Sequence, residues 1–259
     1  MTPEPNDTNA PVISIRGLVT NLGGRVIHDH IDLDVRRGEV IAIVGGSGSG
    51  KSVLLRSIVG LMRPQEGTIT VFGEDALATD ETALRRLQRR WGVLFQEGAL
   101  FSSQTVAENV QVPLREYTKM SQALMNEIAA VKLAMVGLGE DAASKFPSEL
   151  SGGMKKRASL ARALVLDPEI VFLDEPTAGL DPIAANAFDE LIRNLQKSLN
   201  LTVFMVTHDL DTLRSIADRV AVLVNQTLKV GTIAEVMRDK DPWIQDYFSG
   251  PRGRAALGS

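Results

Sequence analysis

Eight consecutive residues are the strongest chemical signal in the sequence. They fit the pattern G-x-x-x-x-G-K-[ST] and follow an apolar run at residues 40–44, which predicts a buried strand. Glycines let such a backbone turn its N–H groups toward an anion, and the helix expected next adds the positive end of its dipole. The lysine is a mobile cation for terminal phosphates, and the last hydroxyl suits Mg²⁺. The sequence therefore predicts a phosphate-binding loop of Gly45, Gly46, Ser47, Gly48, Ser49, Gly50, Lys51 and Ser52.

Three other predicted strands end in polar residues, at Gln96, at Asp174 with Glu175, and at His208. Ligands of parallel α/β sheets bind at the carboxyl ends of strands, so we expect these groups to gather around the phosphate loop. Asp174 would hold Mg²⁺ together with the Ser52 hydroxyl. Gln96 would contact the metal shell or the attacking water. Glu175 would orient or deprotonate that water, and His208 would donate to the terminal phosphate.

A second phosphate site is predicted at Ser151, Gly152 and Gly153, where a hydroxyl and two glycine N–H groups precede a helix. The alternative is that Ser151 only caps that helix. This turn lies on a different part of the chain from the phosphate loop. Two chains arranged head to tail would bring one chain's loop to the other chain's turn, with Asp181 at the seam.

Strands alternate with helices along most of the chain, which predicts an α/β fold with a mostly parallel sheet. Loose alternation over residues 12–35 predicts antiparallel strands joined at Gly23 and Gly24. Residues 97–165 are expected to form an inserted helical subdomain. The domain is expected to span 12–238, between a disordered tail at 1–11 and a C-terminal tail at 239–259.

The composition is that of an ordinary globular protein of 259 residues. Its net charge of −4 argues against a nucleic-acid partner, which favours a basic surface. The chain has no cysteine, hence no disulfide framework or thiolate metal site. No apolar run is long enough to cross a membrane, so we expect any membrane role to depend on a partner.

These motifs, in this order, resemble the nucleotide-binding subunit of an ABC transporter, and the resemblance covers residues 12–238. The phosphate loop matches Walker A, Asp174 and Glu175 match Walker B, and residues 150–153 match the LSGG signature. The resemblance implies a P-loop NTPase core of the RecA type. It also implies an ATPase that uses ATP and Mg²⁺, forms a head-to-tail homodimer and drives an integral membrane permease.

Within this family, three stretches are similar to the ATPase of Mla-type phospholipid transporters. They are residues 96–101 with 105–110, the signature followed by Met154 in place of the family's usual glutamine, and residues 181–183. The resemblance implies phospholipid transport that maintains outer-membrane lipid asymmetry, on the cytoplasmic face of a bacterial inner membrane. It further implies a small regulatory subunit and a lipid-binding substrate protein as partners.

Some features leave alternatives open. The family usually stacks an aromatic residue on adenine upstream of Walker A, but residues 20–26 contain none, and Leu22, Val26 or Arg25 are the candidates. The basic run at residues 155–157 is expected to be the solvated start of a helix, with a phosphate or lipid head group as its alternative contact. His28 and His30 are expected to be surface or packing residues.

The aromatic residues Trp243, Tyr247 and Phe248 predict either an interface or packing on their own domain.

Other functions fit some of these motifs. The same ATPase could serve an amino acid or a drug. An ABC protein acting on DNA or ribosomes would need a long coiled coil or two such domains in one chain. A simple P-loop kinase or GTPase would leave residues 150–153 without a purpose.

Overall fold

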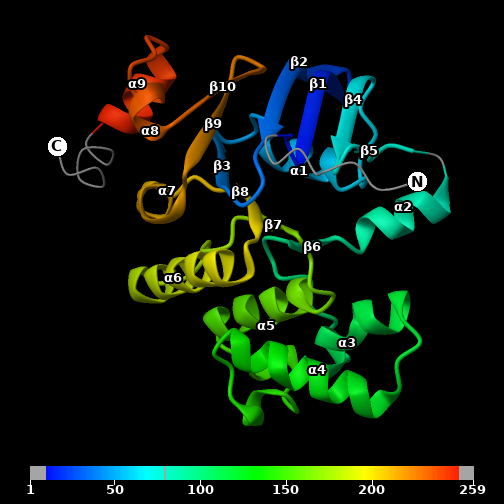
Figure 1. Cartoon of the computed structure of the whole chain (residues 1–259). Coiled ribbons are helices and arrows are strands. Elements are labelled where there is room, and N and C mark those ends of the chain that lie inside the picture. The colour runs from blue at the N-terminus through cyan, green and yellow to red at the C-terminus, as the bar shows by residue number, and fades with distance from the viewer. Residues whose placement is uncertain (1–9, 79, 251–259) are drawn as a thin grey trace. The chain divides into compact units, whose positions relative to one another are not determined.

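The computed structural model describes residues 10–78 and 80–250 (Figure 1). Most of the predicted tail at 1–11, and residues 251–259 of the C-terminal tail, lie outside the described residues. The chain divides into two compact units, one of Met1–Leu87 with His208–Ser259 and one of Gln88–Thr207. Each unit is described by itself.

Unit 1 contains an antiparallel sheet of four strands in the order β2-β1-β4-β5. Strand β1 pairs with β2 around Gly23 and Gly24, which both have positive φ, so the predicted hairpin is confirmed. Alternate apolar side chains of both strands, among them Ile15 and Leu33, are buried. The strands are β1 (Ile13–Leu22), β2 (Arg25–Val35), β4 (Glu66–Val71) and β5 (Glu74–Asp75).

A second group of strands in unit 1 carries the phosphate loop. Strand β3 (Val40–Gly45) pairs in parallel with β9 (Arg219–Val224), and β10 (Thr227–Gly231) pairs antiparallel with β9. Every residue of β3 is buried, as its apolar run predicts. The helices here are α1 (Lys51–Ile58), α7 (Leu210–Ile216), α8 (Ile233–Val236) and α9 (Pro242–Ser249), while α2 (Glu81–Gln88) ends at the unit boundary.

Unit 2 contains three parallel strands in the order β8-β7-β6. They are β6 (Trp91–Leu94), β7 (Ile170–Asp174) and β8 (Thr202–Val206). The predicted helical subdomain contains α3 (Val106–Tyr117), α4 (Gln122–Met135), α5 (Gly152–Leu164) and the 3₁₀ helices η1 (Glu140–Ala142) and η2 (Pro147–Glu149). Helix α6 (Pro182–Leu199) connects β7 to β8, and Asp181 caps it as predicted, with Pro182 in its first position.

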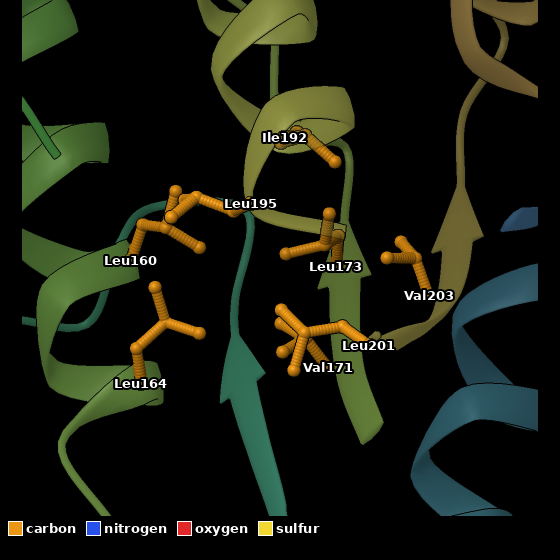
Figure 2. A pocket seen from close by; sticks show the side chains of 8 residues that line it. All are labelled: Leu160, Leu164, Val171, Leu173, Ile192, Leu195, Leu201 and Val203. Atoms are coloured by element: carbon orange, nitrogen blue, oxygen red, sulfur yellow. The ribbon is translucent and has the colours of Figure 1, made fainter. Parts of the chain in front are cut away.

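A small, partly open apolar cavity lies in the core of unit 2. Figure 2 shows the aliphatic side chains that line it, from α5, α6 and the β7 and β8 region. Its volume of about 10 Å³ is close to that of one water-sized probe, and its lining offers no polar partner. The cavity is therefore ordinary packing space and is far too small for a nucleotide or a lipid.

Two predicted boundaries differ from the structure. The helix after the phosphate loop ends at Ile58 instead of residue 62, because Gly60 adopts a φ of 80° and Leu61 donates its N–H back to the Arg56 carbonyl. Strand β6 ends at Leu94, so Gln96 lies in the following turn. Among residues 10–78 and 80–250, no helix has both the length and the hydropathy of a membrane span.

Candidate active site

The phosphate loop connects the end of β3 to the start of α1 in unit 1. Gly50 precedes the helix with a φ of 107°, a conformation that favours glycine, and brings no side chain to cap the first N–H groups. The Lys51 ammonium donates to the carbonyl oxygens of Gly45 at 2.9 Å and Gly46 at 3.0 Å. Lys51 therefore lies against the loop that it was predicted to serve, and the loop ends at a helix N-terminus suited to an anion.

His28 lies directly behind this loop. A methyl group on Gly50 would lie 2.8 Å from Nε2 of His28 and 2.3 Å from Cγ2 of Ile27. The His28 side chain is 0% exposed, and burial lowers its pKa to about 4, against an opposing interaction with the Gly50 backbone. Of the two roles expected for His28, packing is the one observed. Sequence reasoning missed its position because the contact joins β2 to a residue 22 positions away in the chain.

His208 begins the second segment of unit 1 and is exposed. Asp209 follows it and caps α7 by accepting from the N–H groups of Asp211 and Thr212. The His208 carbonyl accepts a hydrogen bond from the Tyr247 hydroxyl at 3.0 Å. His208 and the phosphate loop thus belong to the same unit.

The carboxylates Asp174 and Glu175 lie at the end of β7 in unit 2. Asp174 is the last residue of the strand and is 3% exposed. Glu175 has a φ of 50°, which is unusual for a residue other than glycine, and its N–H donates to the Val206 carbonyl at 2.9 Å. Strained backbone of this kind concentrates at functional sites, where it aims a side chain that regular geometry would not.

Lys156 of α5 joins two of the predicted catalytic segments. Its ammonium donates to the carbonyl oxygens of Gln96 at 2.5 Å and Glu175 at 3.0 Å. The side chain is buried, and burial lowers the pKa of Lys156 while the nearby carboxylates, Glu97 first, oppose that shift.

The prediction that residues 155–157 form a solvated face is wrong for Lys156. A buried cation is tolerated here because two backbone carbonyls and neighbouring acids satisfy it. The neighbouring Arg157 also points inward enough to donate to the Val136 carbonyl at 2.6 Å. No local pattern in the sequence distinguishes Lys156 from an ordinary surface lysine, because its partners are 60 and 19 positions away in the chain.

The signature turn begins α5 and lies beside the loop that leads to Asp181. Ser151 caps the helix by accepting from the Met154 N–H at 3.3 Å, which is the capping role weighed for it. A methyl group on Gly152 would lie 3.7 Å from Cδ2 of Leu180. Unit 2 thus brings the signature and the 180–181 loop together, and Ser151 and Gly152 are exposed.

The loop after Gln96 is held by one buried amide that sequence reasoning did not single out. Asn109 of α3 donates to the carbonyls of Phe101, Gln104 and Thr105, and accepts from the Phe101 N–H at 2.7 Å. Helix α3 itself starts with a capping box between Thr105 and Glu108. These bonds give a physical reason for the residue types at 105–109.

The structure therefore places the predicted residues in two groups. Unit 1 holds the phosphate loop and His208; unit 2 holds Gln96, Asp174 with Glu175, the signature turn and Asp181. Leu22 and Val26, candidates for the adenine contact, are exposed in the β1–β2 hairpin of unit 1. Among the described residues, no group of three or more histidine or acidic side chains forms a metal cage.

Comparison with known proteins decides the family. The profile of the ABC transporter family matches residues 28–178. The chain belongs to the ABC transporter family. A protein of Mycobacterium leprae, named probable ribonucleotide transport ATP-binding protein mkl, is 40% identical to this chain. The aligned region covers 93% of this chain and 69% of the length of that protein. The intermembrane phospholipid transport system ATP-binding protein MlaF of Escherichia coli is 39% identical, and the aligned region covers 93% of this chain and 90% of the length of MlaF.

Solved structures of this family confirm the predicted fold class. The dimeric structure of the ATP-binding cassette MJ0796 bound to ADP and Pi aligns with a TM-score of 0.78 and 29% identity, and the alignment covers 85% of this chain and 98% of that one. The structure of cbiO1 from Clostridium perfringens, part of an ABC transporter complex, aligns with a TM-score of 0.80 and 29% identity. That alignment covers 96% of this chain and 100% of cbiO1. The chain is an ABC ATPase and the ATP-binding subunit of a transporter.

Proposed function

We propose that this ATPase forms a head-to-tail homodimer that powers phospholipid transport through an integral membrane permease, at the cytoplasmic face of a bacterial inner membrane. The observation that carries the proposal is the combination of a complete phosphate loop with an exposed signature turn. The phosphate loop lies in unit 1 and the signature turn in unit 2. A second chain provides the signature turn that each bound nucleotide needs.

Within one nucleotide site, the residues divide the work by their chemistry. The loop residues 45–52 bind the phosphates through backbone N–H groups and Lys51. Glu175 orients or deprotonates the attacking water, His208 donates to the terminal phosphate, and Gln96 contacts that water. From the opposite chain, Ser151, Gly152 and Gly153 bind the same phosphates, with Asp181 at the seam. The strained backbone of Glu175 supports its part in this scheme.

The donor set also fits Mg²⁺. This ion prefers oxygen ligands, keeps several waters and takes phosphate oxygens of the substrate, so it needs only one or two protein groups. Asp174, Ser52 and Gln96 supply such oxygens. When bound, the ion would neutralise phosphate charge that develops during hydrolysis.

The cargo proposal rests on the relatives. The MlaF proteins of Escherichia coli and Haemophilus influenzae are named for intermembrane phospholipid transport, and this chain spans 90% and 92% of their lengths. Maintenance of outer-membrane lipid asymmetry is therefore the proposed task, with a small regulatory subunit and a lipid-binding substrate protein as partners.

A second cargo class has a specific observation in its favour. The mycobacterial relatives at 40% identity are named for ribonucleotide transport, although this chain spans only 67–69% of their lengths. Purification of the chain with its membrane partners, followed by mass spectrometry of bound small molecules, separates the two. Copurified phospholipid supports the lipid proposal, and a copurified ribonucleotide cargo in place of lipid contradicts it.

The mechanism is tested by Glu175→Gln. This variant keeps the size and the hydrogen-bonding reach of the side chain but loses the base, so steady-state ATP turnover is expected to fall by about 10²- to 10⁴-fold. ATP binding, measured by equilibrium dialysis, is expected to persist. Lys51→Ala is the control that loses nucleotide binding itself. Full turnover in Glu175→Gln would show that the mechanism is wrong.

A further inference from the structure

The C-terminal helix α9 contacts two parts of the candidate active site within unit 1. The Tyr247 hydroxyl donates to the His208 carbonyl oxygen at 3.0 Å. At the other part, a methyl group on Gly46 of the phosphate loop would lie 3.4 Å from Nε1 of Trp243, so the indole edge bounds the loop. The Trp243 and Tyr247 rings stack on each other, with centroids 4.8 Å apart and planes 14° apart. One aromatic pair therefore reaches both the loop and the histidine.

Helix α9 is anchored well enough to hold this pair in place. Ile244 and Phe248 are 0% and 1% exposed and fix the helix to the rest of unit 1. The Phe248 ring meets Tyr247 edge-on at 4.9 Å. Asp241 caps the helix, and the Gln245 amide donates to the Met237 carbonyl at 2.9 Å. These aromatic residues pack on their own unit, which is one of the two roles expected for them.

We propose that Trp243 and Tyr247 are positioning residues for ATP hydrolysis. Trp243 limits the movement of the phosphate loop at Gly46, and Tyr247 holds the backbone of His208, so the stacked pair fixes the histidine relative to the loop. Neither residue touches the nucleotide in this scheme. The inference rests on the proposed role of His208 and goes beyond it, because it gives the C-terminal helix a part in catalysis.

The two residues should affect different kinetic constants. The bond from Tyr247 sets the position of the His208 backbone and hence of an imidazole that acts on the terminal phosphate during reaction, so its loss lowers kcat. Trp243 borders the loop that binds the phosphates in the ground state as well, so its loss raises KM for ATP. A helix that only stabilised the fold would, when weakened, reduce the amount of folded protein, which lowers apparent kcat without changing KM. The folded fraction and Tm of each variant must therefore match those of the wild type before its kcat is compared.

Steady-state ATPase assays on single variants of the full chain, or of its membrane complex, test this. Tyr247→Phe keeps the stacked ring and removes only the hydroxyl donor; we expect kcat to fall about 2- to 10-fold, with KM and Tm unchanged. Trp243→Ala is expected to raise KM about 3- to 10-fold, and Trp243→Phe to restore part of that loss. Asp246→Asn, an exposed change on the same helix, is the matched control and should alter neither constant.

Fluorescence gives a readout that is independent of turnover. The chain has two tryptophans, so Trp91→Phe leaves Trp243 as the only one. Binding of ADP with Mg²⁺ is expected to shift the Trp243 emission, and Lys51→Ala is expected to abolish that shift. This arm stays informative if Trp243→Ala does not fold.

The outcomes separate the two proposals. A wild-type kcat in Tyr247→Phe, or a Trp243 emission that does not change when ADP binds, overturns the positioning role. If Glu175→Gln is inactive in the same assays, the proposed mechanism of hydrolysis stands. Full turnover in Glu175→Gln overturns the proposed mechanism itself, regardless of the results for the Trp243 and Tyr247 variants.

Discussion

Burial of a single histidine links the stability of unit 1 to pH. His28 is buried against Gly50, and its pKa of about 4 lies below the ordinary value of 6.5. The unfolded chain therefore binds a proton that the folded chain rejects between these two values. Stability from this group is complete above about pH 6.5 and is lost as the pH falls toward 4. Because His28 supports the loop at Gly50, acid should disturb the phosphate site early.

The pH dependence can be measured directly. Because the pKa of His28 is 6.5 in the unfolded chain and about 4 in the folded chain, this residue makes the unfolding free energy about 3 kcal/mol lower below pH 4 than at neutral pH. His28→Phe should flatten the dependence of the unfolding free energy between pH 4 and 6.5 in urea titrations. His30→Gln is the matched control, since the His30 side chain is 69% exposed. An equally steep dependence in His28→Phe would contradict this account.

At the scale of elements, helix α5 does more than present the signature turn. Its first turn carries Ser151, and Lys156 one turn later is bonded to the backbone of both Gln96 and Glu175. The helix thus ties the signature to the turn after β6 and to the end of β7. Movement of the signature turn would be transmitted to both segments through one buried ammonium group.

Lys156→Met tests this link. Methionine matches the length of the lysine stem but donates to neither carbonyl. The Glu175 carbonyl keeps the Ala178 N–H as a donor, whereas the Gln96 carbonyl loses the lysine bond, so we expect unit 2 to lose about 1–3 kcal/mol of stability. ATP turnover should fall as well, because Glu175 loses a backbone anchor. Thermal melts and ATPase assays of Lys156→Met and of Lys155→Met, its less buried neighbour, provide the comparison. Equal behaviour of the two variants would show that the link has no effect.

The sequence predicted those features that depend on local chemistry. The strand before Gly45, the helix after Lys51, the cap at Asp181 and the hairpin at Gly23 each follow from neighbouring residue types, and the structure contains all of them. The features it missed depend on contacts between distant segments. The burial of Lys156 and the contact of His28 with Gly50 result from pairing that no short pattern encodes. For the same reason, the aromatic residues of α9 could not be assigned between two roles until their partners were known.

As a whole molecule, the proposed enzyme is a dimer in which each chain completes the other chain's site. A variant with Lys51→Ala has no working phosphate loop but an intact signature turn. A variant with Gly152→Asp keeps its phosphate loop and places a carboxylate where the signature turn would bind phosphate. The new Cβ would lie 3.7 Å from Cδ2 of Leu180, an ordinary van der Waals distance, so the substitution is compatible with the fold. Each variant alone is expected to be inactive.

Mixing these two variants is the most direct test. A heterodimer of Lys51→Ala with Gly152→Asp contains one site that joins an intact loop to an intact signature turn from the other chain. We predict that coexpressed, copurified heterodimers recover a substantial part of wild-type ATP turnover. If verified heterodimers are as inactive as the two parent proteins, the signature does not act across chains and the dimer account is contradicted.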